Sequence, residues 1–269
     1  MITSTSNQRI KELSQIQKKS KVRSREGVFV AEGIRMVRET PYERLVSLYF
    51  SESFEKKYGN EVLDAISGGD LKIREQIRRK TEILSDAVFS YVSDTKTPQG
   101  VLAVVRQMEY TLEQMTDGVI PHLMILDNLQ DPGNLGTIFR TAEAAGVTGI
   151  MSRDCVDIYN PKTIRSTMGA LYRMPFVYVE DLRETIHTLK EKSIKSYAAH
   201  LDGKNTYDKE DYRQGTAFLI GNEGNGLREE IAQCADTWIR IPMCGQVESL
   251  NAAVAATVLM FEVSRQRRG

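Results

Sequence analysis

Three short stretches of the sequence place amides, carboxylates or a guanidinium beside glycines. The first, DNLQDPGNLGTIFRTAEAAGV, spans residues 127–147. In it Pro132 and Gly133 predict a turn, and Asn134 can cap the following helix by accepting hydrogen bonds from its free N–H groups. Neither the turn nor the helix explains Arg140. An arginine at that position is either a partner in a surface ion pair or a planar donor that binds phosphate.

The second stretch, LIGNEGNGLREE at residues 219–230, has three glycines after an apolar run. It is neither the GxGxxG pattern of dinucleotide-binding folds nor a Walker phosphate loop, because no Gly-Lys-Ser/Thr follows. Glycine-rich turns after strands are common, so the glycines alone indicate little. Asn222 and Glu223 make the stretch more informative, because polar side chains locked between glycines usually point at a particular group.

The third stretch, IRIPMCGQVESLNAAVAATVLMFEV at residues 239–263, predicts a strand, a proline turn and a final helix. Ser249 is a candidate N-cap for that helix. The alanine-rich run at residues 252–256 leaves room for another backbone to pack closely. Taken alone, the stretch is also compatible with an ordinary terminal helix buried in the core.

The elements that must position these residues follow from the hydrophobic pattern after residue 121. Apolar runs alternate with helical patterns, including helices expected from about Leu135 and from about Ser249 to Arg265. The expected strands are HLMILD, VTGIMS, PFVYV, SYAAH, TAFLIG and TWIRIPM. Continuous apolar strands separated by helices favour an α/β fold with a mostly parallel sheet covered on both faces. Such sheets bind ligands at the carboxyl ends of their strands.

A separate domain is expected before that sheet. The composition suggests a linker at residues 107–120, which divides the chain into a domain at 1–106 and a second domain at 121–269. The first begins with a basic helix at about residues 6–19. GVFVAEGIRMVRE then reads as a strand and a helix, and GVLAVV as a buried strand.

The net charge of zero hides an asymmetry between the two parts of the chain. Residues 1–106 contain 19 Lys and Arg against 14 Asp and Glu, and the remaining residues contain 17 against 22. The segment RIKELSQIQKKSKVRSR at residues 9–25, called the basic segment below, has seven basic side chains and one acidic one. Such a segment is either a solvated face or a binding surface for a polyanion such as RNA.

Several classes of protein are disfavoured by composition. Cys155, Cys234 and Cys244 are far apart and lack the spacing of metal ligands, so we expect buried free thiols and no metal site. Three histidines leave little material for a Ser-His-Asp triad. No run of 18 apolar residues occurs, and the first ten residues lack the apolar centre of a signal peptide, so a cytoplasmic protein with no membrane partner is expected.

Together, the three stretches resemble the three motifs of the SpoU/TrmH family of RNA ribose 2′-O-methyltransferases, which belong to the SPOUT superfamily. The resemblance covers about residues 123–265, and residues 1–106 look like the L30e-like RNA substrate-binding domain that often precedes this catalytic domain. It implies a parallel α/β sheet with a C-terminal trefoil knot, formed by the loops at 221–226 and 242–249 with the last helix passing through. The first motif reads D-P-G-N where N-P-G-N is frequent, and Asp131 can still cap the turn.

The resemblance also implies an enzyme of the EC 2.1.1 class that uses S-adenosylmethionine, and it assigns roles to residues. The implied catalytic residues are Arg140, Asn134, Glu223, Ser249 and Asn251. The implied cofactor-binding residues are Ala199, His200, Gly221, Asn222, Ile241, Met243, Ser249 and Leu250. The expected RNA-binding residues are Arg9, Lys11, Lys18, Lys19, Lys21, Arg23, Arg25 and Arg140.

Arg140 cannot act as a general base, because a guanidinium stays protonated. Its expected role is to hold a phosphate and to stabilise the charge that develops on the attacking ribose oxygen. The family resemblance further implies a homodimer through the knot region. Ribosomal RNA is the favoured substrate and transfer RNA the alternative. Two other hypotheses remain: a catalytically silent RNA-binding protein with this fold, and a nucleotide-dependent oxidoreductase, which the missing GxGxxG turn disfavours.

Overall fold

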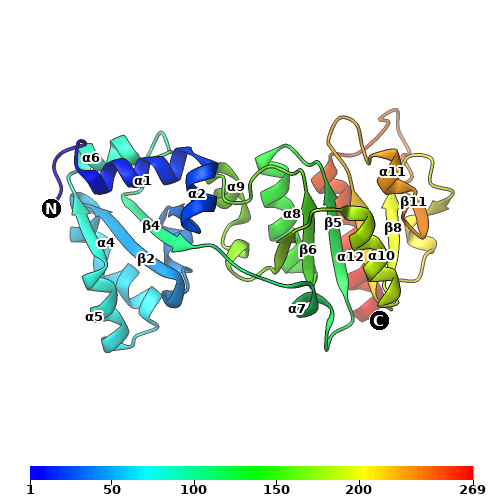
Figure 1. Ribbon diagram of the computed structural model, residues 1–269, viewed down its shortest axis with the longest axis horizontal. Helices are drawn as coiled ribbons and strands as arrows, with labels where there is room; N and C mark the ends of the chain where they lie inside the picture. Colours follow the sequence, from blue (N-terminus) through cyan, green and yellow to red (C-terminus); the bar gives the residue numbers. More distant parts are fainter. Residues whose placement is uncertain (269) are drawn as a thin grey trace. The chain divides into compact units, whose positions relative to one another are not determined.

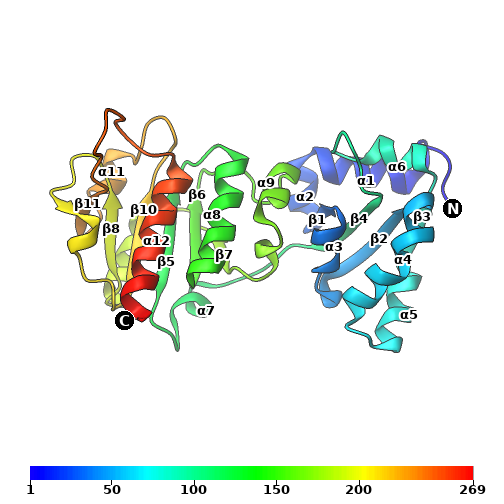
Figure 2. The same cartoon turned by 180° about the vertical axis from the view of Figure 1, so that it is seen from behind.

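In the computed structural model, which describes residues 1–268, the chain forms two units (Figures 1 and 2). The first unit contains residues 1–108 together with a short later segment, residues 157–172. The rest of the described chain makes the second unit. The chain therefore passes from one unit to the other three times, at residues 108–109, 156–157 and 172–173.

The first unit is built on a mixed four-stranded sheet in the order β1-β4-β2-β3. Its strands are β1 (Val28–Glu32), β2 (Leu45–Ser51), β3 (Thr81–Leu84) and β4 (Val101–Arg106). β4 is antiparallel to both of its neighbours, and β2 and β3 are parallel. The sequence predicted β1 and β4 because both are continuous apolar runs, which is the pattern of a strand buried on both faces.

Helices cover both faces of this sheet. They are α1 (Gln8–Lys18), α2 (Ser20–Glu26), α3 (Ile34–Arg38), α4 (Glu52–Ser67), α5 (Leu71–Arg79) and α6 (Asp86–Val92). Ile10 and Leu13 of α1 pack with Val30 and Leu102 in one buried cluster, while α3 and α4 lie on the opposite face (Figures 1 and 2). The expected basic helix is thus amphipathic: its apolar side is buried and its lysines face solvent.

The segment 157–172 belongs to the first unit although it lies between two strands of the second. It contains α9 (Pro161–Thr167) and a 3₁₀ turn at Ala170–Tyr172. Tyr159 stacks on Phe29 of β1 at 4.9 Å between ring centroids, and its hydroxyl accepts a hydrogen bond from the Met108 amide. Asp157 forms an ion pair with Arg23 of α2. These contacts make the segment part of the core of the first unit.

The second unit is built on a seven-stranded sheet, and every pairing in it is parallel. The strands are β5 (His122–Asp127), β6 (Gly149–Arg153), β7 (Phe176–Tyr178), β8 (Lys195–Ala199), β9 (Asn205–Thr206), β10 (Thr216–Ile220) and β11 (Thr237–Arg240). Their order is β7-β6-β5-β10-β8-β11-β9. β5 and β10 are buried at every position, as expected for central strands of a sheet covered on both sides.

The helices of this unit are α7 (Leu112–Thr116), α8 (Pro132–Ala145), α10 (Leu182–Glu191), α11 (Glu229–Ala232) and α12 (Ala252–Arg268). α8 and α12 pack side by side on one face of the sheet, and α10 lies on the other (Figures 1 and 2). On the α10 face, Leu182 and Ile186 pack against Ile125, Met151 and Leu219 of the strands. The predicted fold class, an α/β protein with a parallel sheet after a small α/β domain, is confirmed.

Two predicted helix starts are wrong. α8 begins at Pro132 and is capped by Asp131, whose carboxylate accepts a hydrogen bond from the Asn134 amide at 2.8 Å. Asn134 therefore lies inside the first turn and does not cap the helix. α12 begins at Ala252, where the Asn251 side chain accepts hydrogen bonds from the Ala253 and Val254 amides; Ser249 is not the cap. The expected helix end at Gly146 is confirmed, with φ of 76°.

Candidate active site

The loops that follow four neighbouring strands meet at one edge of the parallel sheet. β5, β10, β8 and β11 are adjacent in the sheet, so the loops after them all leave from their carboxyl ends. Each of the three sequence stretches contributes one of these loops. The edge is where open α/β sheets bind ligands.

A cavity of about 860 Å³ opens between these loops. Its size is within the range typical of small-molecule sites. All eight predicted cofactor-binding residues line it: Ala199, His200, Gly221, Asn222, Ile241, Met243, Ser249 and Leu250. Sequence reasoning did not select several other lining residues, among them Asp202, Arg240 and Glu248. The walls combine apolar side chains, such as Leu250, with charged ones, such as Asp202 and Glu248, and a cofactor that joins a nucleoside to an amino acid offers groups of both kinds.

The glycine-rich loop closes on itself beside this cavity. The backbones of Asn222 and Gly226 exchange two hydrogen bonds, and the Asn222 side chain accepts from the Gly224 and Asn225 amides. A Cβ atom on Gly221 would lie only 2.1 Å from the backbone carbon of Gly226. Gly221 is therefore required by the close approach of the loop's own backbone, whereas a Cβ on Gly224 would make ordinary contact at 3.6 Å.

Three of the predicted catalytic residues, one from each sequence stretch, form one hydrogen-bonded chain. The Asn251 side-chain amide donates to Asn134 Oδ1 at 3.0 Å, and Asn134 Nδ2 donates to Glu223 Oε1 at 3.1 Å. The Glu223 carboxylate also accepts from the backbone amides of Gln130 and Asp131, at 3.1 and 2.9 Å. Each residue comes from a different motif, so the folded chain joins the three stretches at this point.

Glu223 is ionised in this arrangement. Desolvation raises the pKa of its carboxyl, but the hydrogen bonds from Asn134, Asp131 and Gln130 favour the charged form and leave the pKa below its usual value. The carboxylate accepts and cannot donate, so it fixes the Asn134 amide with its nitrogen toward Glu223 and its oxygen toward Asn251.

Arg140 lies two turns into α8 and is exposed. Within residues 1–268, its guanidinium has no hydrogen bond or ion pair, so it is available to a ligand. Ser249 lines the cavity and is exposed. His200 packs against Trp238 at 4.3 Å between ring centroids, and its Nδ1 accepts from the Asp202 amide.

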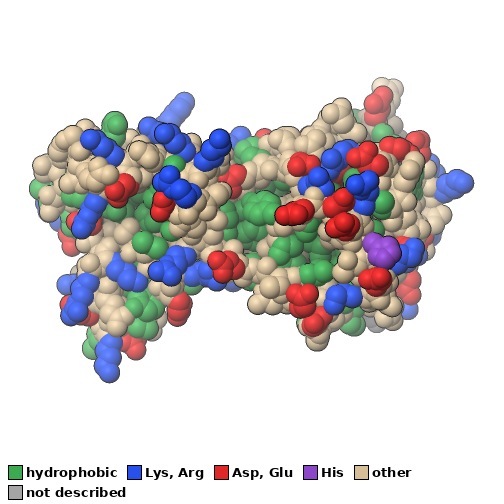
Figure 3. Space-filling model, viewed as in Figure 1, with side chains coloured by type: hydrophobic (Ala, Val, Ile, Leu, Met, Phe, Trp, Pro, Cys, Tyr) green, Lys and Arg blue, Asp and Glu red, His purple; other side chains and the backbone are tan. Residues whose placement is uncertain are grey.

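The basic segment lies on α1 and α2 of the first unit. Lys and Arg side chains gather over these helices (Figure 3), and Lys11, Lys18, Lys19 and Lys21 are exposed. Arg9, which pairs with Glu82, and Arg25, which pairs with Glu26, are also exposed at the surface.

The prediction that Arg23 binds RNA is wrong. It is 4% exposed, and its guanidinium donates to Asp157 and to the carbonyls of Ile16 and Gln17. A buried and fully engaged guanidinium cannot reach RNA, so Arg23 holds α1, α2 and residue 157 together.

The cysteines are free, but the expectation that all three are buried is wrong for Cys244, which is exposed. Cys155 and Cys234 are partly buried, and burial raises the pKa of the Cys155 thiol to about 11. In the part of the chain that the structure describes, no group of His, Cys, Asp and Glu side chains could hold a metal ion. Among the helices of residues 1–268, none is long and apolar enough to cross a membrane.

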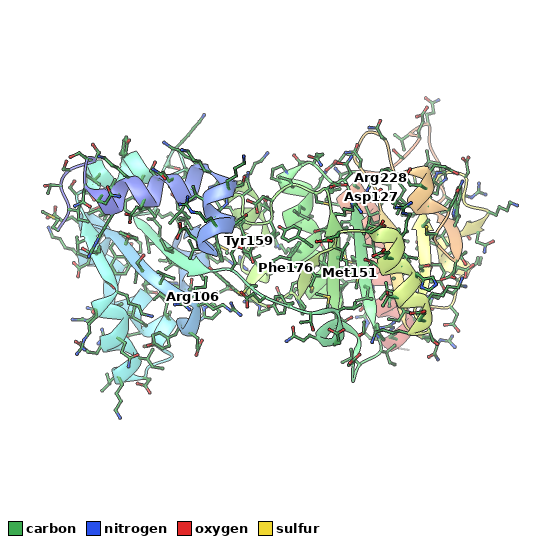
Figure 4. The ribbon with its side chains drawn as sticks, viewed as in Figure 1. Arg106, Asp127, Met151, Tyr159, Phe176 and Arg228 are labelled. Carbon is green, nitrogen blue, oxygen red and sulfur yellow. The ribbon has the colours of Figure 1, made fainter. Side chains whose placement is uncertain are left out.

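An ion pair that sequence reasoning missed lies at the base of the site (Figure 4). Asp127 ends β5 and is 0% exposed, and its carboxylate binds the guanidinium of Arg228, which follows the glycine-rich loop. Asp127 begins the first of the three sequence stretches and Arg228 lies in the second, but no local pattern links positions 101 residues apart.

The architecture of the second unit is that of a parallel α/β enzyme domain whose ligand cavity lies at the carboxyl edge of the sheet. The SpoU rRNA Methylase family model matches residues 121–261, and the MRM3-like substrate binding domain model matches residues 7–103. The chain belongs to the SpoU rRNA methylase family. The resemblance stated from its motifs is confirmed, together with the RNA methyltransferase class and the preceding substrate-binding domain.

Relatives cover nearly the whole chain. The 23S rRNA (guanosine(2553)-2′-O)-methyltransferase RlmP of Bacillus subtilis is 30% identical over 97% of this chain and 98% of its own length. The SpoU methyltransferase AviRb of Streptomyces viridochromogenes, solved in complex with the cofactor AdoMet, superposes with a TM-score of 0.82 at 26% identity, covering 98% of this chain and 99% of AviRb. An AdoMet-bound rRNA methyltransferase of Sinorhizobium meliloti gives 0.80 at 28% identity, over 98% and 97%.

Proposed function

We propose that this chain transfers the methyl group of S-adenosylmethionine to a ribose 2′-hydroxyl of ribosomal RNA. The observation that carries the proposal is the hydrogen-bonded chain from Asn251 through Asn134 to Glu223, beside a cavity lined by all eight residues predicted to bind the cofactor. The relatives named above include a 23S rRNA 2′-O-methyltransferase and two proteins solved with the same methyl donor.

The protein's own task in this reaction is alignment. When bound, S-adenosylmethionine supplies a methyl group that is already activated by the positive sulfonium. The ionised Glu223 fixes the Asn134 amide, and the Asn134–Asn251 contact holds the start of α12 against α8. Arg140, exposed on α8, is left to hold an RNA phosphate and to stabilise charge on the attacking oxygen. Ser249 lines the cavity and would contact the donor.

Binding and product mapping test the function. We expect purified protein to bind S-adenosylmethionine and its demethylated product by calorimetry, and the RNA of a strain lacking the protein to lose one ribosomal 2′-O-methyl group. Loss of a methyl group from transfer RNA would identify the alternative substrate. RNA binding without affinity for either form of the cofactor would identify a catalytically silent protein and refute the proposal.

The RNA is expected to bind through the exposed part of the basic segment. Arg9, Lys11, Lys18, Lys19, Lys21 and Arg25 form this surface. Arg23 is excluded because it is buried. We further propose that the protein acts in the cytoplasm.

The protein is also proposed to be a homodimer with a trefoil knot. The loops that would form the knot, 221–226 and 242–249, both contribute residues to the cavity. Along α12, Val254 and Phe261 are 49% and 42% exposed, and Val258 lies between them at helical spacing. This apolar stripe suits a second copy of the chain. Phe261→Glu is expected to convert a dimer into a monomer in sedimentation experiments, while an unchanged mass would exclude the stripe from the interface.

A further inference from the structure

The Asp127–Arg228 ion pair has more contacts than a single surface bridge. Arg228 Nε donates to both carboxylate oxygens of Asp127, at 2.9 and 3.1 Å, and Nη2 donates to Oδ1. The backbone amide of Arg228 donates to Oδ2 at 3.3 Å. Asp127 is fully buried, while Arg228 is partly exposed. The guanidinium and the main chain of Arg228 are therefore held by the same carboxylate.

The pair joins the bases of two loops. Asp127 directly precedes the loop at residues 128–131, and Arg228 directly follows the glycine-rich loop at 221–227. The same two loops meet again at their tips, where Glu223 accepts from the amides of Gln130 and Asp131. Between base and tip, the Asn222 side chain donates to the carbonyl of Asn128 at 2.9 Å. The ion pair thus joins two loops that are also connected by these hydrogen bonds.

Unusual backbone conformations surround the pair. Asn128, the residue after Asp127, has φ of 57°, and Asp154, the residue after β6, has φ of 55°. Left-handed conformations at residues other than glycine cost free energy and persist where the surroundings determine them. Arg228 Nη1 lies 3.5 Å from Asp154 Oδ2, so the guanidinium approaches carboxylates at the ends of two adjacent strands.

Burying an ion pair contributes little net stability, because desolvation offsets the attraction, and the better attested use of such pairs is to fix one arrangement among several. We infer that Asp127 and Arg228 are positioning residues for the candidate active site: they set the register of the two loops so that Glu223 meets Asn134. Neither residue lines the cavity, so they act through the loops. The inference rests on the proposed function, since Glu223 and Asn134 serve the methyl transfer.

Amide hydrogen exchange and kinetics test this role in the full-length protein. Arg228→Gln removes the planar two-point contact and keeps a polar side chain at a partly exposed position. We expect faster exchange in peptides covering residues 128–134 and about a hundredfold lower kcat, the loss that a displacement of about 1 Å can cause. The KM for RNA and the affinity for S-adenosylmethionine should stay within about threefold of the wild type. The substitution changes the alignment of the reacting groups and leaves the groups that bind RNA and cofactor in place.

A double-variant comparison separates positioning from simple stabilisation. Glu223→Gln weakens the acceptor at the loop tips, and it should speed exchange in the same peptides. In the double variant with Arg228→Gln, the increase in exchange should be smaller than the sum of the two single-variant increases. The reason is that both substitutions release the same contact between the two loops. Arg265→Gln is the matched control: it breaks a 2.7 Å pair with the buried Glu262 on α12 and should leave residues 128–134 unchanged.

Two results would overturn the inference. The first is an exchange rate at residues 128–134 of Arg228→Gln that equals that of the wild type. The second is a fall in kcat accompanied by an equally large loss of cofactor affinity and by a lower melting temperature. Absence of methyl transfer by the wild type would refute the proposed function instead. In that case the exchange data would still show whether the ion pair fixes the loops.

Discussion

At the scale of single residues, the folded chain decides which of several similar side chains takes which role. Asp131 and Asn134 are both good helix caps, and the sequence alone favoured Asn134. In the structure Pro132 occupies the first helical position, so Asp131 takes the cap and the Asn134 side chain is left to bind Glu223 and Asn251. The residue types of the site were predictable, whereas their hydrogen-bond partners, which come from distant loops, were not.

Arg140→Ala is expected to abolish methyl transfer while leaving S-adenosylmethionine binding intact. The guanidinium is exposed on α8 and is not among the residues that line the cavity, so its removal should affect RNA and the developing charge but not the cofactor. Single-turnover methylation and calorimetry measure the two effects separately. Arg183→Ala, which removes an exposed arginine from α10, is the control. Equal loss of binding and transfer in Arg140→Ala would contradict this division.

At the scale of elements, six of the seven strands of the second unit were predictable from apolar runs between turn residues, as β5 and β10 illustrate. The two-residue strand β9, Asn205–Thr206, is polar and was missed. The placement of residues 157–172 was not predictable. A periodic pattern indicates that one face of a helix is buried, but it does not tell which domain buries that face. Tyr159 and Phe29, which stack in the first unit, are 130 positions apart in the sequence. The burial of Arg23 was missed for the same reason, since its partner Asp157 lies in that segment.

Gly221→Ala and Gly224→Ala are expected to differ sharply. An added Cβ on Gly221 would overlap the backbone at Gly226 and Leu227, with separations of 2.1 to 2.2 Å, so the loop must open and the cavity wall must move. On Gly224 the added atom has room. Calorimetry with S-adenosylmethionine should show at least about a tenfold loss of affinity for the first variant, equivalent to about 1.4 kcal/mol, and little change for the second. Similar affinities would mean that the loop does not shape the binding site.

At the scale of the whole molecule, RNA binding should depend on salt through the basic segment. Lys18, Lys19 and Lys21 are exposed there, and each phosphate they neutralise contributes about 0.7 to the slope of log K against log salt on single strands. Replacing all three by Gln should lower that slope by up to about 2. Titrations at several salt concentrations measure it, with Lys56→Gln and Lys57→Gln on α4 as the control. An unchanged slope would exclude the segment from RNA contact.

Acid should destabilise the protein partly through His122. Burial, with a smaller effect from Arg267, lowers its pKa to about 3, against 6.5 for an exposed histidine. Between these values the unfolded chain binds a proton that the folded chain does not, so stability falls as pH decreases, by at most about 1.4 kcal/mol per pH unit. Above pH 6.5 the imidazole is neutral in both states and has no such effect.

His122→Leu should remove this part of the acid sensitivity. Urea unfolding of both proteins between pH 7 and pH 4 measures it, and other titrating groups cancel in the comparison. The free energies of the variant and the wild type should diverge as pH falls through that range. Parallel curves would mean that His122 is solvated in the folded protein.

The chain's return to its first unit at residues 157–172 has a consequence for recombining such proteins. A graft that transplants only the N-terminal hundred residues onto another catalytic domain would leave behind the tyrosine that covers Phe29 and the acid that neutralises Arg23. Functional chimeras should therefore require exchange of both the N-terminal domain and residues 157–172. In evolution, the short segment should be inherited together with that domain.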